Sequence, residues 1–359
     1  MKIITTMIKY LNVCLLIFLV NCSTEKEEKN ISFNEKKVEE VSILLNADTT
    51  NEIASPAWIK SVSDGFLLYD AGIDEIAKFN LYGQKSFSFG SSGRGPGEFQ
   101  SIGEFWKFDN IFLVYDINGQ KLITYDYAGN LIKDIPLGFV DFPGMPSGIE
   151  AINSRQFVMP SGGKDGSLLT LVDIESESKK YVGDAVSEKY MVTQSPDERR
   201  QAIYSGNIPA IYKNNVLLSS NESGFFSFQQ TTAILEKYSH SGALLWQKNL
   251  KVPAIDGLFE DLFEENKSRI DSGEFLLQFA YAFGISANNK GVGVLLNVRE
   301  NRPVTIAWVP NDGEELTVIT FRDLENPSPV PLRFAISEDS DIFFSSTLEG
   351  VIYRAEWPL

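Results

Sequence analysis

The sequence is poor in the residues that most zinc and redox sites use. Its 359 residues include two cysteines and one histidine, His240. A disulfide framework needs more cysteines, and a common zinc site needs several cysteine or histidine ligands, so we expect neither. His240 lies next to a predicted tight turn, which is typical of a solvated loop residue. No second histidine exists for a relay or a facial metal triad.

Basic residues are also scarce. Lysine and arginine total 32 against 48 acidic residues, which gives a formal net charge of −16. A protein that binds DNA or RNA through its phosphates needs a basic face, so nucleic acid is not an expected partner. The hydrophobic fraction of 43% and the charged fraction of 22% are ordinary for a folded chain and argue against bulk disorder.

The hydrophobic run near the start is too short to span a bilayer comfortably, which takes about 20 residues. This run, at residues 11–20, follows Lys2 and Lys9 and has the size of a signal-peptide core. The stretch at 19–22 (Leu-Val-Asn-Cys) resembles a bacterial lipobox, although its asparagine replaces the usual small residue. We therefore expect lipidation at Cys22, and the alternative is an ordinary secretory signal with an incidental cysteine.

These features divide the chain into three parts. Residues 1–21 are expected to be a lipoprotein signal peptide, residues 22–38 a flexible polar tether, and residues 39–359 a folded domain. The acidic residues after Cys22 resemble export signals of surface lipoproteins in Bacteroidota-type bacteria. The expected location is the cell envelope, as an outer-membrane lipoprotein that faces the periplasm or the surface and reaches the membrane through its lipid only.

The folded part contains an internal repeat. Residues 65–70 (Gly-Phe-Leu-Leu-Tyr-Asp) match residues 111–116 (Ile-Phe-Leu-Val-Tyr-Asp), and the same spacing separates the glycine turns at Gly83 and Gly129. Each unit has the pattern of four short strands with turn signals between them. A period of about 45 residues with four strands per unit is typical of a β-propeller blade.

Four more units follow the same pattern, at residues 148–185, 209–250, 282–321 and 332–357. The sixth lacks its last strand, whereas residues 41–45 (Val-Ser-Ile-Leu-Leu) form a strand without a blade of its own. Because an open ring leaves exposed sheet edges, we expect this strand to complete the sixth blade. The sequence thus predicts an all-β fold, a six-bladed propeller of four-stranded blades with one short helical insertion. A five- or seven-bladed ring and two β-sandwiches are the alternatives.

The glycine-rich stretch at 89–99 (Phe-Gly-Ser-Ser-Gly-Arg-Gly-Pro-Gly-Glu-Phe), followed by the strands at 111–116 and 121–129, resembles an NHL repeat. With the lipobox, the chain resembles the six-bladed NHL-like or TolB-like propeller lipoproteins of Bacteroidota-type bacteria. One repeat matches strongly, its predecessor well, and the other four in outline. The resemblance implies a fold and a location, and many such propellers lie near glycan-uptake systems.

Two aspartates and the glycine-rich loop are the first candidate binding residues. Asp70 and Asp116 end equivalent strands, where paired carboxylates could hold Ca²⁺ or act as acid and base. The favoured alternative is that each carboxylate fixes the adjoining turn. The loop at 90–97 lacks the Lys-Ser/Thr end of a P-loop, so its glycines are expected to shape the crossing between blades, with Arg94 and Glu98 exposed there.

Two long insertions, at 186–207 and 252–281, connect successive blades on the same side as the glycine-rich loop. The second contains apolar residues at helical spacing, namely Ile255, Leu258, Phe259, Leu262 and Phe263. This helix is expected to lie on the propeller's own rim, and a lid or a partner-binding helix is the alternative. The first insertion carries a mixed-charge segment at 197–200, expected as a solvated loop in which Arg199 or Arg200 could bind a carboxylate.

The favoured function is non-enzymatic, because no nucleophile–base set is visible. In this hypothesis the lipid-anchored propeller is a binding or scaffold module for an envelope protein, a glycan or a small ligand, without a cofactor. The alternative is a metal-assisted hydrolase or lyase that uses acidic residues at the central channel, with Ca²⁺ as the candidate metal. A sensor module that signals through the tether is a third hypothesis.

Overall fold

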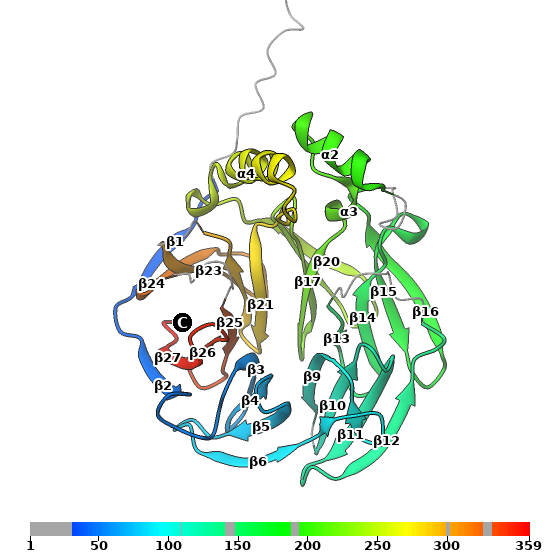
Figure 1. Ribbon diagram of the computed structural model, residues 1–359, viewed down its shortest axis with the longest axis vertical. Helices are drawn as coiled ribbons and strands as arrows, with labels where there is room; N and C mark the ends of the chain where they lie inside the picture. Colours follow the sequence, from blue (N-terminus) through cyan, green and yellow to red (C-terminus); the bar gives the residue numbers. More distant parts are fainter. Residues whose placement is uncertain (1–30, 109, 141–147, 188–193, 299–301, 326–331) are drawn as a thin grey trace, which may run out of the picture. The chain divides into compact units, whose positions relative to one another are not determined.

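The computed structural model describes residues 31–108, 110–140, 148–187, 194–298, 302–325 and 332–359. The chain divides into two compact units, residues 1–32 and 33–359, and every element described below belongs to the second. Six sheets surround a common centre in this unit (Figure 1). The second unit is a six-bladed β-propeller, which confirms the fold predicted from the repeat.

In each blade the strands follow one another in chain order from the centre of the ring outward, except that the N-terminal strands β1 and β2 form the outer edges of blades five and six. Blade one contains β3 (Pro56–Val62), β4 (Gly65–Asp70), β5 (Glu75–Phe79) and β6 (Lys85–Phe89). Blade two contains β9 (Ile102–Phe108), β10 (Ile111–Asp116), β11 (Lys121–Asp126) and β12 (Leu131–Pro136). Blade three contains β13 (Glu150–Ala151), β14 (Gln156–Pro160), β15 (Ser167–Asp173) and β16 (Ser178–Asp184).

Blade four contains β17 (Val216–Asn221), β18 (Gly224–Gln229), β19 (Ile234–Tyr238) and β20 (Leu244–Asn249). Blade five contains β21 (Ala282–Asn288), β22 (Gly291–Leu296), β23 (Pro303–Pro310) and β24 (Thr317–Glu325). Blade six contains β25 (Arg333–Ile336), β26 (Asp341–Ser346) and β27 (Val351–Glu356), completed by β2 (Ser42–Asn46). A short parallel pair, β7 (Ser91–Ser92) with β8 (Glu98–Phe99), lies in the glycine-rich loop.

The position of a strand in its blade determines its hydrophobic pattern. Second strands such as β4 and β22 are covered on both faces by neighbouring blades, and their residues are almost all apolar and buried. Outer strands such as β6 and β20 alternate covered and exposed residues. The core lies between blades, as where the rings of Phe89 and Phe112 stack with centroids 4.5 Å apart.

Antiparallel pairing of β2 with β27 closes the ring. Ser42 lies opposite Arg354 and Asn46 lies opposite Val351. Leu44 and Leu45 of β2 pack against the apolar cluster between blades six and one. The strand expected at 41–45 is therefore confirmed, displaced by one residue, together with its role in completing the last blade.

A further strand, β1 (Asn34–Val38), pairs in parallel with β24 and gives blade five a fifth strand. Only Val38 of this strand is buried, because β1 is an edge strand without a neighbouring blade on either face. Its polar sequence therefore lacks the alternation that marks a strand. The predicted tether at 22–38 is thus corrected, since residues 34–38 belong to the propeller. The predicted signal peptide and Cys22 lie outside the described residues.

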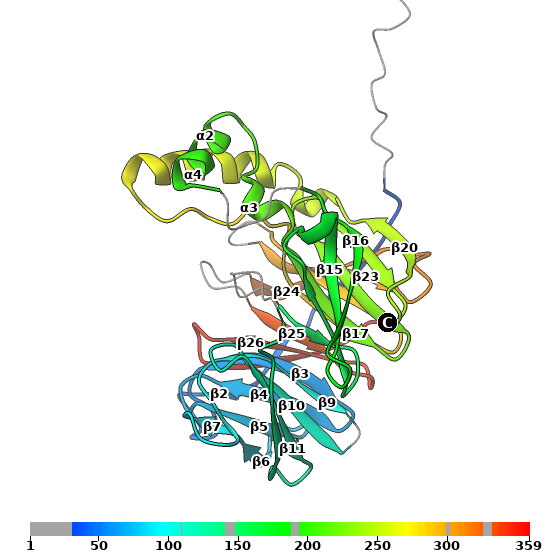
Figure 2. The same cartoon turned by 90° about the vertical axis from the view of Figure 1, so that its right-hand side faces the viewer.

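The helical elements are α2 (Pro196–Tyr204), α3 (Ala210–Lys213) and α4 (Leu258–Ser272), with single 3-10 turns at η1 (Lys164–Gly166) and η3 (Pro253–Ile255). Figure 2 shows α2, α3 and α4 gathered at one end of this unit. The α4 helix confirms the amphipathic pattern, and its Leu258, Phe259 and Leu262 are buried. Among the described residues, no helix is long and apolar enough to cross a membrane.

The mixed-charge segment at 197–200 is helical, which corrects the predicted loop. Ser195 caps α2, because its Oγ accepts a hydrogen bond from the Glu198 N–H while the Glu198 carboxylate accepts one from the Ser195 N–H. Pro196 occupies the first helical turn, where its missing N–H costs nothing. This capping box forms the helix start despite the weak hydrophobic pattern.

Candidate functional site

A cavity of about 1400 Å³ runs along the inner strands of all six blades. It exceeds the roughly 300–1,000 Å³ of a typical small-molecule pocket. Leu258, Leu262 and Arg269 of α4 contribute to its lining. The second insertion therefore reaches the channel, whereas none of residues 90–97 of the glycine-rich loop lines it.

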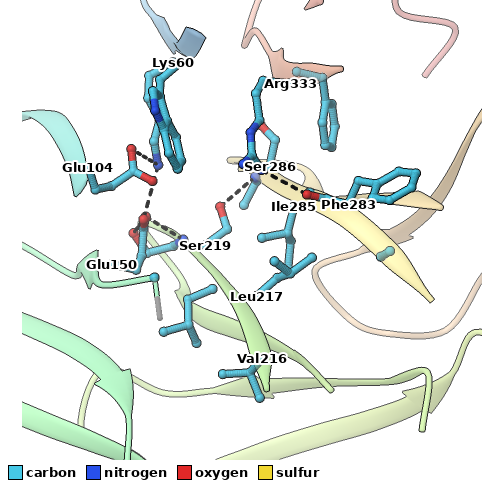
Figure 3. A pocket seen from close by; sticks show the side chains of 18 of the residues that line it. Lys60, Glu104, Glu150, Val216, Leu217, Ser219, Phe283, Ile285, Ser286 and Arg333 are labelled. Atoms are coloured by element: carbon cyan, nitrogen blue, oxygen red, sulfur yellow. Dashed lines mark hydrogen bonds and ion pairs between the residues drawn. The ribbon is translucent and has the colours of Figure 1, made fainter. Parts of the chain in front are cut away.

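Each inner strand contributes a polar or charged side chain to this cavity. Blades one to three supply Lys60 of β3, Glu104 of β9 and Glu150 of β13. Blades four to six supply Ser219 of β17, Ser286 of β21 and Arg333 of β25 (Figure 3). Because inner strands lie side by side around the axis, six separate segments of the chain meet at one place.

Lys60, Glu104 and Glu150 form an ionic cluster. The Lys60 Nζ lies 3.2 Å from Glu150 Oε2 and 3.6 Å from Glu104 Oε1. Glu150 is almost fully buried, so its charge needs several partners. Trp106 Nε1 donates to Glu150 Oε2 at 2.9 Å, and the Ser220 N–H and Oγ donate to Oε1 at 3.1 and 2.8 Å. Side chains and backbone of three other strands therefore hold the Glu150 carboxylate in place, and both of its oxygens accept hydrogen bonds.

Glu104 is the less satisfied carboxylate of the cluster. Burial raises its pKa to about 6, and the negative charge of Glu150 acts in the same direction, while Lys60 opposes the shift. Among the described residues, its carboxylate accepts a hydrogen bond from the N–H of Phe105, the next residue in the chain, at 3.2 Å. Burial by itself would lower the pKa of Lys60, but Glu104 and Glu150 raise it overall, so Lys60 stays charged. Glu104 can therefore exchange a proton near neutral pH.

The other half of the cavity carries hydrogen-bond donors. The Arg333 guanidinium stacks on the Trp58 ring, with its central carbon 4.5 Å from the ring centroid. Its Nη1 donates to the Phe283 carbonyl at 3.0 Å (Figure 3). Burial lowers the pKa of Arg333, and Glu104 opposes this effect. Among the described residues, no carboxylate forms an ion pair with Arg333, in contrast to Lys60.

Asp70 and Asp116 lie outside this cavity, and both hold main-chain groups. Asp70 accepts four hydrogen bonds, from the N–H groups of residues 54, 55, 72 and 73, at 2.7 to 3.1 Å. Asp116, fully buried, accepts one from the Ser101 N–H at 3.1 Å. The turn-fixing interpretation fits Asp70 fully and fits Asp116 through Oδ1 only, because the buried Oδ2 of Asp116 has no hydrogen-bond partner among the described residues. A metal or substrate at Asp70 would have to displace its four backbone donors.

The remaining predicted binding residues are also outside the cavity lining. Arg94 is exposed, while the Glu98 carboxylate accepts a hydrogen bond from the Gly95 N–H at 2.7 Å and stabilises its own loop. Arg200 lies 3.8 Å from Asp197 on the exposed face of α2, and Arg199 is half-buried. The structure does not bring these four residues together with Asp70 and Asp116 into one site.

His240, Asn221 and Asn288 also line the cavity. His240 is exposed, as predicted, and its Nε2 lies 3.3 Å from the Asn221 carbonyl oxygen. Asn221 Nδ2 donates to the Asn288 carbonyl at 2.7 Å, which joins blades four and five. Within the described parts of the chain, no group of three or more His, Cys, Asp or Glu side chains is placed to hold a metal ion.

The cavity residues were not predicted, because they lie on inner strands, whereas the predicted binding residues lie at strand ends and in loops. A usable signal was present, since Lys60 follows Trp58-Ile59, Glu104 precedes Phe105-Trp106, and Glu150 lies between Ile149 and Ala151. A charged side chain inside an otherwise apolar inner strand is costly unless it is paired. The three residues do not share one register position, because Lys60 lies opposite Leu67 of its second strand whereas Glu104 lies opposite Tyr115, so aligning the repeats would not have grouped them.

Comparison with known proteins supports the class defined by this fold. The family model described as a 6-bladed beta-propeller (DUF5128) matches residues 20–148, which is less than half of the chain. No curated protein matches the sequence. These results agree with the six blades of the structure, and the family match covers the N-terminal part, including blades one and two.

Several solved structures share the fold at low sequence identity. A protein of Bacteroides fragilis that is named as an exported protein is 11% identical, with a TM-score of 0.56, covering 90% of this chain and 99% of its own. A DUF4221 family member from Bacteroides vulgatus is 10% identical, with a TM-score of 0.51, covering 89% and 96%. A streptogramin B lyase is 11% identical, with a TM-score of 0.47, covering 88% and 96%. At identities this low, the two Bacteroides proteins are evidence for the fold alone.

Proposed function

We propose that the protein is a binding module of the bacterial cell envelope, whose ligand enters the channel cavity. One observation carries this proposal: all six inner strands direct a polar or charged side chain into a single continuous cavity. A propeller stabilised by its core alone has no need for such groups there, because each buried charge costs free energy unless it is paired. The volume suits an oligomeric ligand, such as a short glycan or a peptide.

A survey of glycans and peptides with the folded domain tests this proposal. Ser286→Trp would fill the cavity from blade five, so bound ligands should be lost in this variant. Ser178→Trp, on an exposed position of β16, is the matched control and should retain binding. Ligands that bind the two variants equally well would contradict a channel site, as would a survey in which no glycan or peptide binds.

Attachment to the membrane through Cys22 is the second part of the proposal. The lipobox at 19–22 supports it, and the exported relative in Bacteroides agrees with an envelope location. In a Bacteroidota host, the wild-type protein should fractionate with membranes and incorporate labelled fatty acid, whereas Cys22→Ser should do neither. Membrane association of Cys22→Ser equal to wild type would refute lipid anchoring.

Acid–base catalysis is a second candidate function, favoured by one observation. Glu104 has a pKa of about 6 in a cavity and lies 3.6 Å from a charged lysine, which is the setting of many general acids and bases. A hydrolase or lyase of this kind would rely on Glu104 rather than on Asp70 and Asp116. Each ligand found in the survey is incubated with the wild type and with Glu104→Gln, and its conversion is measured. Conversion by the wild type that is lost in Glu104→Gln would support this function, and no conversion of any ligand by the wild type would contradict it.

A further inference from the structure

We infer that the half of the cavity built by blades four to six binds a carboxylate or sulfate group of the ligand. This inference rests on the proposed binding function and specifies its chemistry. The two halves differ in how far their polar groups are satisfied. Blades one to three form a closed cluster in which Glu150 accepts four hydrogen bonds and Lys60 contacts two carboxylates. The inner strands of blades four to six present donors from Ser219, Ser286 and Arg333, and no described carboxylate bonds to these three side chains.

Arg333 is the central group of this donor half. The Trp58 ring covers one side of the guanidinium at 4.5 Å, and the hydrogen bond from Nη1 to the Phe283 carbonyl restrains its rotation. Among the described residues, its Nε and Nη2 groups have no hydrogen-bond acceptor. A guanidinium held in this way presents the paired N–H groups that match a carboxylate or sulfate in a bidentate contact. The arginine is therefore preorganised, and no carboxylate of the described residues forms an ion pair with it.

Two serine hydroxyls add further donors beside it. Ser219 Oγ accepts from the Ala287 N–H at 3.0 Å, and Ser286 Oγ accepts from the Ile336 N–H at 3.2 Å. Each hydroxyl has thus used one of its lone pairs, and its hydrogen has no acceptor among the described residues. Both hydroxyls lie on inner strands, and Ser286 bonds to the same strand that carries Arg333. A set dominated by donors selects a ligand rich in acceptor oxygens.

The overall charge of −16 does not prevent this binding. Exposed charges more than about 10 Å away are screened at ordinary ionic strength, whereas a guanidinium inside the channel acts at contact distance. Lys60 lies between Glu104 and Glu150 and neutralises one of these two negative charges. Glu104 also favours the charged form of Arg333, but no described carboxylate forms an ion pair with the guanidinium, so its remaining N–H groups can bind an anionic group of a ligand.

The test uses sodium acetate, sodium glucuronate and sodium sulfate as probes, measured by calorimetry and by the shift in Tm against sodium chloride of equal ionic strength. Arg333→Met keeps an aliphatic chain over Trp58 but removes the donors. Arg322→Met is the matched control, because Arg322 is an exposed arginine of β24 that pairs with Glu39 outside the cavity. Wild type and Arg322→Met should bind at least one probe saturably, and Arg333→Met should bind it about tenfold more weakly or worse.

The three probes also distinguish the source of the anion. If glucuronate binds more tightly than acetate, and Ser219→Ala and Ser286→Ala remove this difference, the ligand is a sugar acid. If sulfate binds most tightly, the ligand is sulfated. Arg333→Lys, which keeps the charge without the fork, should bind with intermediate strength and guards against a folding defect in the methionine variant. Equal binding by wild type and Arg333→Met, or no saturable binding of any probe, would overturn the inference. A neutral ligand that binds Arg333→Met as well as wild type but does not bind Ser286→Trp would overturn the inference of an anion site. The same result would leave the proposed channel-binding function intact.

Discussion

At the scale of single residues, Glu104 couples the channel to pH. Its carboxyl group titrates near pH 6 in the folded protein because burial and Glu150 disfavour the charged form. In an unfolded chain the same group would titrate near its ordinary value of 4.5. Between these two values the folded state holds a proton that the unfolded state has released, so the free energy of unfolding falls as the pH rises.

Glu104→Gln should remove this part of the pH dependence. The shift from 4.5 to about 6 corresponds to about 2 kcal/mol, which the wild type loses as the pH rises from below 4.5 to above 6 and the variant does not. Urea unfolding at pH 4, 5, 6 and 7 measures the difference. The exposed Glu356→Gln is the control and should follow the wild type. Parallel profiles for wild type and Glu104→Gln would show that Glu104 is not perturbed.

Asp70 is a second residue whose role the geometry defines. Its replacement by alanine leaves four main-chain N–H groups around a buried position without their acceptor. We expect Asp70→Ala to lower the free energy of unfolding by at least about 3 kcal/mol, which is the contribution of one or two of its four hydrogen bonds, since hydrogen bonds to charged groups contribute about 1.5–3 kcal/mol each. Asp197→Ala, at an exposed position of α2, should change it by less than about 0.5 kcal/mol. Denaturant titration of both variants checks this, and a loss equal to that of Asp197→Ala would contradict the role.

At the scale of secondary-structure elements, α4 is tied to the segment that returns from it to blade five. Asn266 is fully buried, and its side chain bonds to both main-chain groups of Leu277, donating to the carbonyl at 3.2 Å and accepting from the N–H at 2.7 Å. These bonds mimic a strand pairing across the turn after the helix. Because Leu277 and Gln278 line the cavity, this one amide positions part of the channel wall.

Asn266→Ala should therefore loosen the return segment more than the helix itself. We expect a loss of about 2 kcal/mol in unfolding free energy, because the two main-chain groups of Leu277 lose their partners. Hydrogen exchange and limited proteolysis should both increase over residues 273–279. Lys267→Ala, an exposed neighbour paired with Glu264, should leave both measurements near wild type. Unchanged protection over 273–279 in Asn266→Ala would show that other contacts hold the segment.

Elements whose formation depends on their own apolar pattern could be predicted, and those that depend on a partner could not. The strands at 65–70 and 111–116 carry hydrophobic runs imposed by burial between blades, and the sequence places them correctly. β1 has no such pattern because the edge of β24 supplies its hydrogen bonds. The site shares this difficulty: Lys60 and Glu150 are 90 residues apart in sequence, and ring closure alone brings them together.

At the scale of the whole molecule, the ring depends on a strand from the opposite end of the chain. β2 covers the edge of β27, and Leu44 and Leu45 pack into the core between blades six and one. Without β2, the last blade would expose an unpaired strand edge and an apolar surface, which together favour aggregation. Closure is therefore a property of the complete fold, and no blade can achieve it locally.

Two shortened chains separate the roles of the N-terminal strands. A chain that begins at residue 41 loses β1 and should remain monodisperse, since most of that strand is exposed. A chain that begins at residue 47 also loses β2. Its free energy of unfolding should be lower than that of the chain beginning at residue 41 by about 3 kcal/mol or more, because Leu44 and Leu45 no longer cover the core. Light scattering and denaturant titration compare the two. Equal stability and equal monodispersity would show that β2 does not close the ring energetically.

The parallel pairing of β1 with β24 has a mechanical consequence. A pulling force applied ahead of residue 34 reaches β1 first, and β1 is bonded to blade five and, through Lys36 Nζ, to the carbonyl of Pro358. β2 follows only after β1 has yielded. The outermost strand β1 thus protects the closing strand β2, because tension on the preceding segment first separates the five residues of β1, four of them exposed, from β24.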